Sequence, residues 1–227
     1  MKTLGLRQFM AIIAVMIAWN TPALAASSDE QKLVDLARIA VELIRENPNL
    51  SSFPGLLKRA KAVIVVPELV KAGFFIGGEG GSGMLLARDP ATGEWSYPAF
   101  YTMAAASIGF QIGAQVSKVM FLIMTDGGLE AMMSNKLTLG ADASVAAGPI
   151  GAGIEVGTTF NIDADIYSFS LTKGLFGGIS FEGAALVPDD EANEAYYGQA
   201  IAARGIVIHR EVENADADEL RAALVTE

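Results

Sequence analysis

Few residues of this chain belong to the types that carry covalent chemistry. It has no Cys and a single His, His209, which stands beside Arg210 and Glu211 near the C-terminal end. Ser82 lies among glycines, but Met84 occupies the last glycine position of the G-x-S-x-G nucleophile elbow. A hydrolase acting on lipids is therefore the least favoured function, and we predict no catalytic residues and no enzyme.

Acid–base and metal chemistry are equally poorly supported. Asp163 and Asp165 are two residues apart, so they would share one face of a strand. A solvated strand end explains that pair better than general acid–base catalysis. One His, no Cys and no calcium-loop spacing leave too few ligands for a metal site. We predict no metal and no cofactor.

A glycine-rich segment matches a nucleotide-binding pattern. Residues Gly78–Gly83, GEGGSG, satisfy G-x-G-x-x-G, which binds a pyrophosphate when a strand precedes it and a helix follows it. Here Met84–Arg88 is typical of a strand, Asp89-Pro90 of a turn, and Glu79 would place a negative charge at the phosphate. We therefore predict a flexible hairpin connection and no nucleotide.

The basic residues are the most informative candidates. The chain carries 16 Lys and Arg against 26 Asp and Glu, a net charge of −10, which argues against nucleic acid as a partner. A local cluster of cations beside aromatic residues opposes this global sign. Its members, the candidate lipid-binding residues, are Lys58, Arg59, Lys61, Lys71, Phe74 and Phe75. Each cation near anionic head groups contributes about 1 kcal/mol. A solvated loop with buried Phe side chains is the alternative interpretation.

The first 25 residues have the pattern of a secretory signal peptide. Lys2 and Arg7 form a positive start, Phe9–Trp19 is a short apolar region, and Ala23–Ala25 fits an A-x-A cleavage site. We expect an exported protein, periplasmic or secreted, that associates peripherally with a membrane. Residues 26–227 are expected to form a single domain.

An amphipathic helix is predicted at the start of that domain, over residues 28–46. Ser27 and Glu30 have capping-box spacing, and Asn47-Pro48 ends the apolar helical repeat. The helix could insert into a membrane or dock on the core of its own domain. Because its polar face mixes charge signs, whereas interfacial helices carry a Lys/Arg-rich face, docking on the core is favoured.

The central stretch, Glu94–Thr125, decides the fold class. Its apolar content approaches that of a membrane-spanning helix, but Pro98, Gly109, Gly113 and Lys118 interrupt it. We predict strands of a β core that covers about residues 60–187. Other strands are expected at Ala62–Val66, where Pro67 stops the strand, at Ile154–Phe160, at Ala164–Leu171 as a half-buried strand, and at Ile206–Ile208. Helices are expected at Asp189–Tyr197 and Asp216–Val225.

The predicted fold class is α+β, with a strongly curved, mostly antiparallel, glycine-rich β-sheet or partial barrel and peripheral helices. Glycines within strands point to sharp bends, bulges or close backbone approach.

A series of motifs resembles the SYLF domain. They are KAGFFIGG at Lys71–Gly78, PAFY at Pro98–Tyr101, SIGFQIG at Ser107–Gly113, LGADAS at Leu139–Ser144 and EANEAYYG at Glu191–Gly198. The resemblance extends from about Gln31 to Ile208. It implies a non-enzymatic, phospholipid-binding domain, with phosphoinositides or other anionic lipids as ligands and a membrane surface as partner. Eukaryotic relatives are also linked to actin, which an exported protein would not meet. An outer-membrane-associated structural β protein is the alternative function.

Overall fold

The computed structural model describes residues 28–148, 164–172, 175–177 and 181–226, with no side-chain description for 73–77, 107–114 and 175–177. The expected leader, residues 1–25, and the expected strand at 154–160 lie outside the described residues. Export therefore stays a prediction.

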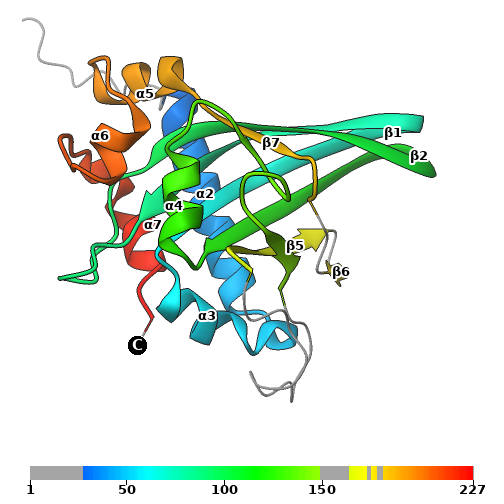
Figure 1. Cartoon of the computed structure of the whole chain (residues 1–227), viewed down its shortest axis with the longest axis horizontal. Coiled ribbons are helices and arrows are strands. Elements are labelled where there is room, and N and C mark those ends of the chain that lie inside the picture. The colour runs from blue at the N-terminus through cyan, green and yellow to red at the C-terminus, as the bar shows by residue number, and fades with distance from the viewer. Residues whose placement is uncertain (1–27, 149–163, 173–174, 178–180, 227) are drawn as a thin grey trace, which may run out of the picture.

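Two long antiparallel strands, β1 (Ala62–Ala87) and β2 (Ala99–Ile123), form the centre of the sheet. They pair from Ala62 opposite Ile123 to Leu85 opposite Ala99, and Figure 1 shows them extending together away from the helices to a common tip. The central stretch is thus strand, as predicted. The prediction that Pro67 stops the first strand is wrong: Pro67 falls in a register shift between Val66 and Leu69, where a bulge tolerates a residue without an N–H.

β1 doubles back on itself, so that its end lies beside its beginning. The N–H of Arg88 donates to the carbonyl of Lys61 at 2.7 Å. A Cβ added to Gly81 would lie 2.5 Å from the carbonyl oxygen of Glu68, and one added to Gly83 would lie 2.7 Å from that of Val65. The GEGGSG segment is therefore part of a strand, and the predicted hairpin connection is wrong. Its glycines permit a close approach of two backbone segments.

Shorter strands complete a seven-stranded sheet among the described residues, with order β3-β7-β2-β5-β4, β1 on β2 and β6 on β5. Only β4 and β5 pair in parallel. The α+β class with a strongly curled, mostly antiparallel sheet is confirmed. The five shorter strands are β3 (Leu137–Thr138), β4 (Val145–Ala147), β5 (Ile166–Thr172), β6 (Leu175–Gly177) and β7 (Ala185–Pro188).

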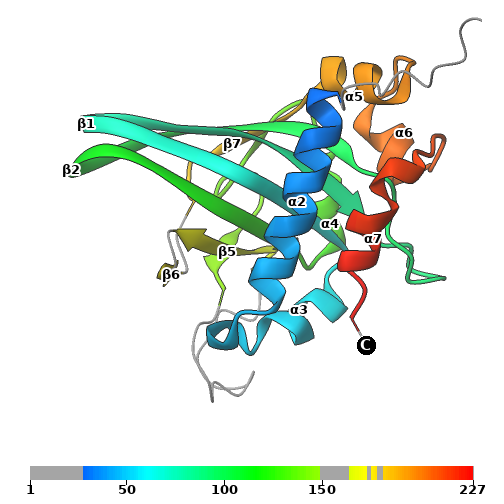
Figure 2. The ribbon, with the colours of Figure 1, turned by 180° about the vertical axis from the view of Figure 1, so that it is seen from behind.

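Helices cover both faces of the sheet. In Figure 1 α4 lies in front of the sheet, and in Figure 2, from behind, α2 crosses it, with α3 and α7 at the same end. None of the described helices is long and apolar enough to cross a membrane. The α-helices are α2 (Asp29–Arg45), α3 (Phe53–Arg59), α4 (Asp126–Met132), α5 (Asp190–Tyr197), α6 (Ala203–Val207) and α7 (Asp218–Ala223); the 3-10 helices are Pro48–Leu50 and Ala215–Ala217.

The N-terminal helix docks on the core of its own domain. The N-cap of α2 is Ser28, one residue after the predicted cap, and its side chain accepts a hydrogen bond from the N–H of Gln31. Its buried stripe, Val34, Ala37, Ala40, Val41 and Ile44, belongs to an apolar cluster shared with β1, β2 and β5. The prediction that the apolar face of this helix docks on the core of its own domain is confirmed.

A second apolar cluster fills the other face of the sheet, and it explains two wrong predictions. β5 is buried at six of its seven positions, not half-buried, because its alternate residues enter different clusters: Phe169 faces α3, and Ile166 enters the second cluster. Ile206 and Val207 are buried in helix α6 and not in a strand. A short apolar run does not distinguish a strand from a buried helical turn.

Asp165 connects three segments at the end of the sheet. Its carboxylate accepts hydrogen bonds from Thr125 Oγ1 at 2.5 Å, Ser144 Oγ at 2.7 Å and the Ser144 N–H at 3.0 Å. The Thr125 and Ser144 hydroxyls lower the pKa of Asp165 below its ordinary value of 3.8. The predicted structural role at a strand end is supported, whereas Asp163 lies outside the described residues.

This carboxylate predicts an acid-dependent loss of stability. A lowered folded-state pKa means that the stabilisation is complete above the unfolded-state pKa and is lost as pH falls through the folded-state pKa. We expect Asp165→Asn to lower the free energy of unfolding at pH 7 by on the order of 1 kcal/mol, because the site is partly exposed and solvent screens it. Urea unfolding at pH 7 and below pH 4 measures this. A deficit that persists unchanged in acid would contradict the proposed role.

Candidate functional site

A pocket of about 450 Å³ opens where the end of α3, both ends of β1, the start of α4 and the segment after α6 meet. This volume is in the usual range for small-molecule sites. We name it the basic pocket. Its lining residues are Lys58, Arg59, Ala60, Lys61, Ala87, Arg88, Asp89, Pro90, Asp126, Leu129, Val207, Ile208 and Arg210.

The chain brings these residues together through the doubling back of β1. Lys58 and Arg59 occupy the last turn of α3, where positive charge is favourable beside the free helix carbonyls. Lys61 follows and leads into β1, whose far end returns Arg88 to the same place through the Arg88 N–H to Lys61 carbonyl bond. Residues nearly thirty apart in sequence thus share one wall.

Arg88 fixes the end of α3 against the end of β1. Its guanidinium donates to the carbonyls of Lys58 at 2.6 Å and Leu57 at 2.9 Å, and it lies 4.6 Å from the centre of the Trp95 ring. Burial lowers the pKa of Arg88 from its ordinary value. Among the described residues no carboxylate forms an ion pair with Arg88, and its buried Nε has no hydrogen-bond partner.

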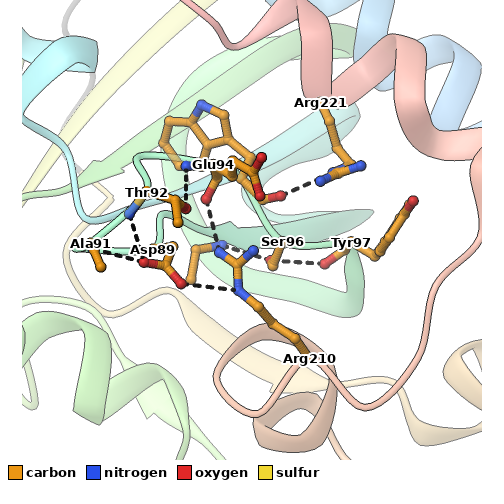
Figure 3. Close-up of polar contacts among 10 residues, drawn as sticks. Asp89, Ala91, Thr92, Glu94, Ser96, Tyr97, Arg210 and Arg221 are labelled. Carbon is orange, nitrogen blue, oxygen red and sulfur yellow. Dashed lines mark hydrogen bonds and ion pairs between the residues drawn. The ribbon is translucent and has the colours of Figure 1, made fainter.

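Arg210 also lines the basic pocket, and Figure 3 shows its contacts with Asp89 and Glu94. It adopts a left-handed backbone conformation, with φ 55°, which is uncommon for a residue other than glycine. This conformation accompanies a hydrogen bond from Nη2 to the carbonyl of Glu94 at 2.8 Å and an ion pair with Asp89 at 3.9 Å. Strained residues of this kind cluster at functional sites.

The turn between β1 and β2 is held in one shape. Asp89 accepts hydrogen bonds from the N–H groups of Thr92 and Ala91, which lower its pKa, and Gly93 has a φ of +79°. This is the turn predicted from the sequence. Figure 3 shows Arg210 and Arg221 beside the turn and the residues that follow it. The Nε of Arg221 donates to the Trp95 carbonyl at 2.9 Å. The wall of the basic pocket is therefore anchored by the C-terminal segment.

The charge of the basic pocket opposes that of the chain. Five cationic residues line it with only two carboxylates, Asp89 and Asp126, whereas the whole chain carries −10. Asp126 pairs with Lys61 at 2.6 Å. Ile208 also lines the pocket and is 38% exposed, so an apolar side chain accompanies the cations at the surface.

Three of the lipid-binding residues predicted from the sequence lie in the basic pocket, and Lys71 does not. Lys58, Arg59 and Lys61 line the basic pocket. Lys71 does not: it lies ten residues along β1 from Lys61, roughly 30 Å for an extended strand, and it pairs with Glu79 at 2.6 Å. Phe74 and Phe75 are on β1 among residues whose side chains are outside the description.

Sequence reasoning missed Arg88 and Arg210. Arg88 ends an apolar run immediately before a Pro-containing turn. This pattern predicts the end of a strand, but it does not predict which residues lie beside Arg88 in the folded chain. Arg210 stands beside the single His, and nothing in the sequence connects it with Glu94, 116 residues away.

The candidates for catalysis do not form a site in the described structure. Ser82 is exposed on β1, and His209 is exposed after α6. No cluster of three or more His, Asp or Glu side chains in the described part of the chain is arranged to hold a metal ion.

The strongly curled, mostly antiparallel sheet and its helices define an α+β protein. Comparison with known families then identifies it: the Ysc84 family, described as Las17-binding protein actin regulator, matches residues 104–226. The chain belongs to this family, and the resemblance to the SYLF domain is confirmed.

Similar proteins occur in animals and yeast. The chain is 34% identical over 193 residues to the rat SH3 domain-containing YSC84-like protein 1, covering 81% of this chain and 56% of the relative. It is 35% identical over 160 residues to LAS seventeen-binding protein 3 of Saccharomyces cerevisiae, covering 69% of this chain and 34% of the relative. The chain spans about half the length of the rat relative.

Proposed function

We propose that this protein is a non-enzymatic domain that binds anionic phospholipid at a membrane surface through the basic pocket. The observation that supports the proposal is the gathering of Lys58, Arg59, Lys61, Arg88 and Arg210, with the exposed Ile208, in one place on an acidic chain. Cations beside exposed apolar residues are the usual composition of a surface that docks on anionic lipid.

The energetics favour reversible, salt-dependent attachment. Each cation near the head groups contributes about 1 kcal/mol, and this contribution decays within a Debye length of about 8 Å at physiological salt. Asp89 and Asp126 offset part of the attraction, and the acidic remainder of the chain is repelled by the same lipid. The basic pocket must therefore face the membrane for binding to occur.

Liposome co-sedimentation tests the proposal. We expect the wild-type chain to bind vesicles containing phosphatidylglycerol but not pure phosphatidylcholine. Combined Lys58→Glu, Arg59→Glu and Lys61→Glu changes should weaken binding by at least about 100-fold, because three attractions become repulsions.

A control with the same change in net charge is available away from the pocket. It combines Lys32→Glu, Lys71→Glu and Lys136→Glu, three exposed cations that do not line the basic pocket. We expect a much smaller effect from this control. Equal loss from both triple variants would contradict the site, and no binding of the wild type to any anionic vesicle would refute the function.

We do not extend actin regulation from the relatives to this chain, because we propose that it is exported. That proposal rests on Lys2, Arg7, the apolar Phe9–Trp19 and the Ala23–Ala25 cleavage pattern. N-terminal sequencing of the secreted or periplasmic protein tests it, with Ala26 expected as the first residue.

A further inference from the structure

We infer that the basic pocket contains a specific oxyanion subsite in which Arg88 contacts a terminal phosphate monoester. This inference rests on the proposed function and names the residue and the head-group chemistry of the same site. The shared chemistry is a phosphate with one ester link or none, supplied by a lipid head group or by a free phosphate.

Arg88 differs from Lys61 and Arg210 in how its charge is balanced. Lys61 pairs with Asp126, and Arg210 pairs with Asp89. In the part of the chain that the structure describes, no carboxylate forms an ion pair with Arg88. The guanidinium of Arg88 stays charged at neutral pH. Among the described residues, its polar and ring contacts are with two carbonyls and the Trp95 ring. A partly buried charge without a counter-ion is costly in a protein, so an arriving anion gains more at Arg88 than at an exposed lysine.

The position of Arg88 is fixed before any ligand arrives. Two bonds to the carbonyls of Leu57 and Lys58 and the stacked Trp95, which is 3% exposed, hold the guanidinium in the wall of the pocket. These bonds use two of its five N–H groups. A planar guanidinium with free N–H groups suits two oxygens of one phosphate.

The charge of the pocket favours the monoester over the diester. The lining carries excess positive charge, with five cations against two carboxylates. A phosphate monoester carries a charge of about −1.5 to −2 at pH 7, because its second pKa is about 6. A phosphodiester carries a single charge and keeps two unesterified oxygens, whereas a monoester has three, so a monoester held by Arg88 at two oxygens still offers a third to the other cations of the pocket. The apolar part of the lining, with Leu129, Val207 and Ile208, suits the carbon portion of a ligand.

Fluorescence of the unmodified protein provides the first test. We expect inorganic phosphate to change the emission of Trp95, because its ring stacks on the guanidinium that receives the anion. Sodium chloride at the same ionic strength is the control. Trp95→Phe gives the background, which comes from Trp19 in the full chain and from no tryptophan after the proposed cleavage at Ala25. An identical response to phosphate and chloride would overturn the inference.

Vesicle binding provides the second test. Phosphatidic acid has a monoester head group and phosphatidylglycerol a diester, and both are mixed into phosphatidylcholine at equal surface potential. We expect the wild type to bind phosphatidic acid vesicles at least about tenfold more tightly, because the monoester brings more charge and a third oxygen to the fixed guanidinium. We expect Arg88→Lys to reduce the ratio of the two affinities to about one, because lysine keeps the positive charge but lacks the planar fork that holds two oxygens of the monoester.

Arg221→Lys is the matched control for Arg88→Lys. Arg221 also bonds a backbone carbonyl, that of Trp95, and lies 4.2 Å from the centre of an aromatic ring, Tyr97, but it does not line the pocket. We expect it to keep the preference. If Arg88→Lys is folded by near-UV circular dichroism and still prefers phosphatidic acid, the inference is wrong. If it does not fold, the fluorescence response of the wild type decides.

The results separate the inference from the proposed function. A phosphate response without any vesicle binding supports the oxyanion subsite with a free phosphate as ligand and refutes the membrane function. Equal binding to both anionic vesicles, with no phosphate response, supports the membrane function and overturns the subsite.

Discussion

Gly81→Ala is expected to lower the free energy of unfolding by about 3 kcal/mol or more, because the new methyl group has no space. Its Cβ would lie 2.5 Å from the carbonyl oxygen of Glu68 and 3.1 Å from Val66 Cγ1. The obstacle is backbone, which a rotamer change cannot remove. The two arms of β1 would have to separate, and that separation would also pull Arg88 away from Lys61.

Gly80→Ala is the matched control for this prediction. It lies one residue earlier in the same segment, and its added Cβ would meet only the carbonyl oxygen of Met103 at an ordinary 3.6 Å. We expect a change within about 1 kcal/mol, and stabilisation is reasonable because alanine restricts the unfolded chain. Urea unfolding followed by circular dichroism measures both variants. If the two lose the same stability, the close approach of the arms of β1 is not what requires glycine at position 81.

The doubling back of β1 also marks the limit of what could be predicted from the sequence. The helical repeat, the capping residues and Asn47-Pro48 predicted α2 to within about one residue at either end. Pro98, Gly109, Gly113 and Lys118 correctly excluded a helix from the central stretch. These features act locally. The sequence predicted separate strands at Ala62–Val66 and Met84–Arg88, because Pro67 and the glycines are local strand breakers. In the tertiary structure the same residues form a bulge and a close backbone contact within one strand.

The same limit applies to the candidate site. Lys58, Arg59 and Lys61 were found because they are neighbours in sequence, and Lys71 was added for the same reason, although β1 carries it toward the other end of the ribbon. Arg88 and Arg210 were missed because they reach the basic pocket only through the doubling back of β1 and the packing of the C-terminal segment. The neighbouring cations were therefore predicted from the sequence, whereas the positions of Arg88 and Arg210 depend on the tertiary structure.

The glycine-rich motif illustrates how one pattern can have two physical causes. In a dinucleotide site the glycines let a backbone approach a pyrophosphate. Here Gly81 and Gly83 let a backbone approach another part of the same strand. The pattern alone does not distinguish these cases, and the following element does, since Met84–Ala87 continues as strand and no helix begins there.

Phe53→Ala is expected to cost about 3–5 kcal/mol of stability and also to weaken lipid binding, although Phe53 does not line the basic pocket. Phe53 begins α3, is fully buried, and packs edge-to-face on Phe169 of β5 with ring centres 5.0 Å apart. This contact seats the helix whose last turn carries Lys58 and Arg59. Without it, α3 depends on its remaining buried residues and on its bonds to Arg88.

Phe181→Ala separates this effect from a general loss of stability. Phe181 makes a similar edge-to-face contact with Phe121, ring centres 5.1 Å apart, in the apolar cluster on the other face of the sheet. Under conditions where both variants are native, we expect Phe53→Ala to bind anionic vesicles several-fold more weakly and Phe181→Ala to bind like the wild type. Packing would then position the cations, because a charge cluster of given composition binds well only when its helix is fixed. Equal binding by the two variants would show that Lys58 and Arg59 act without a docked α3, as a flexible basic segment does.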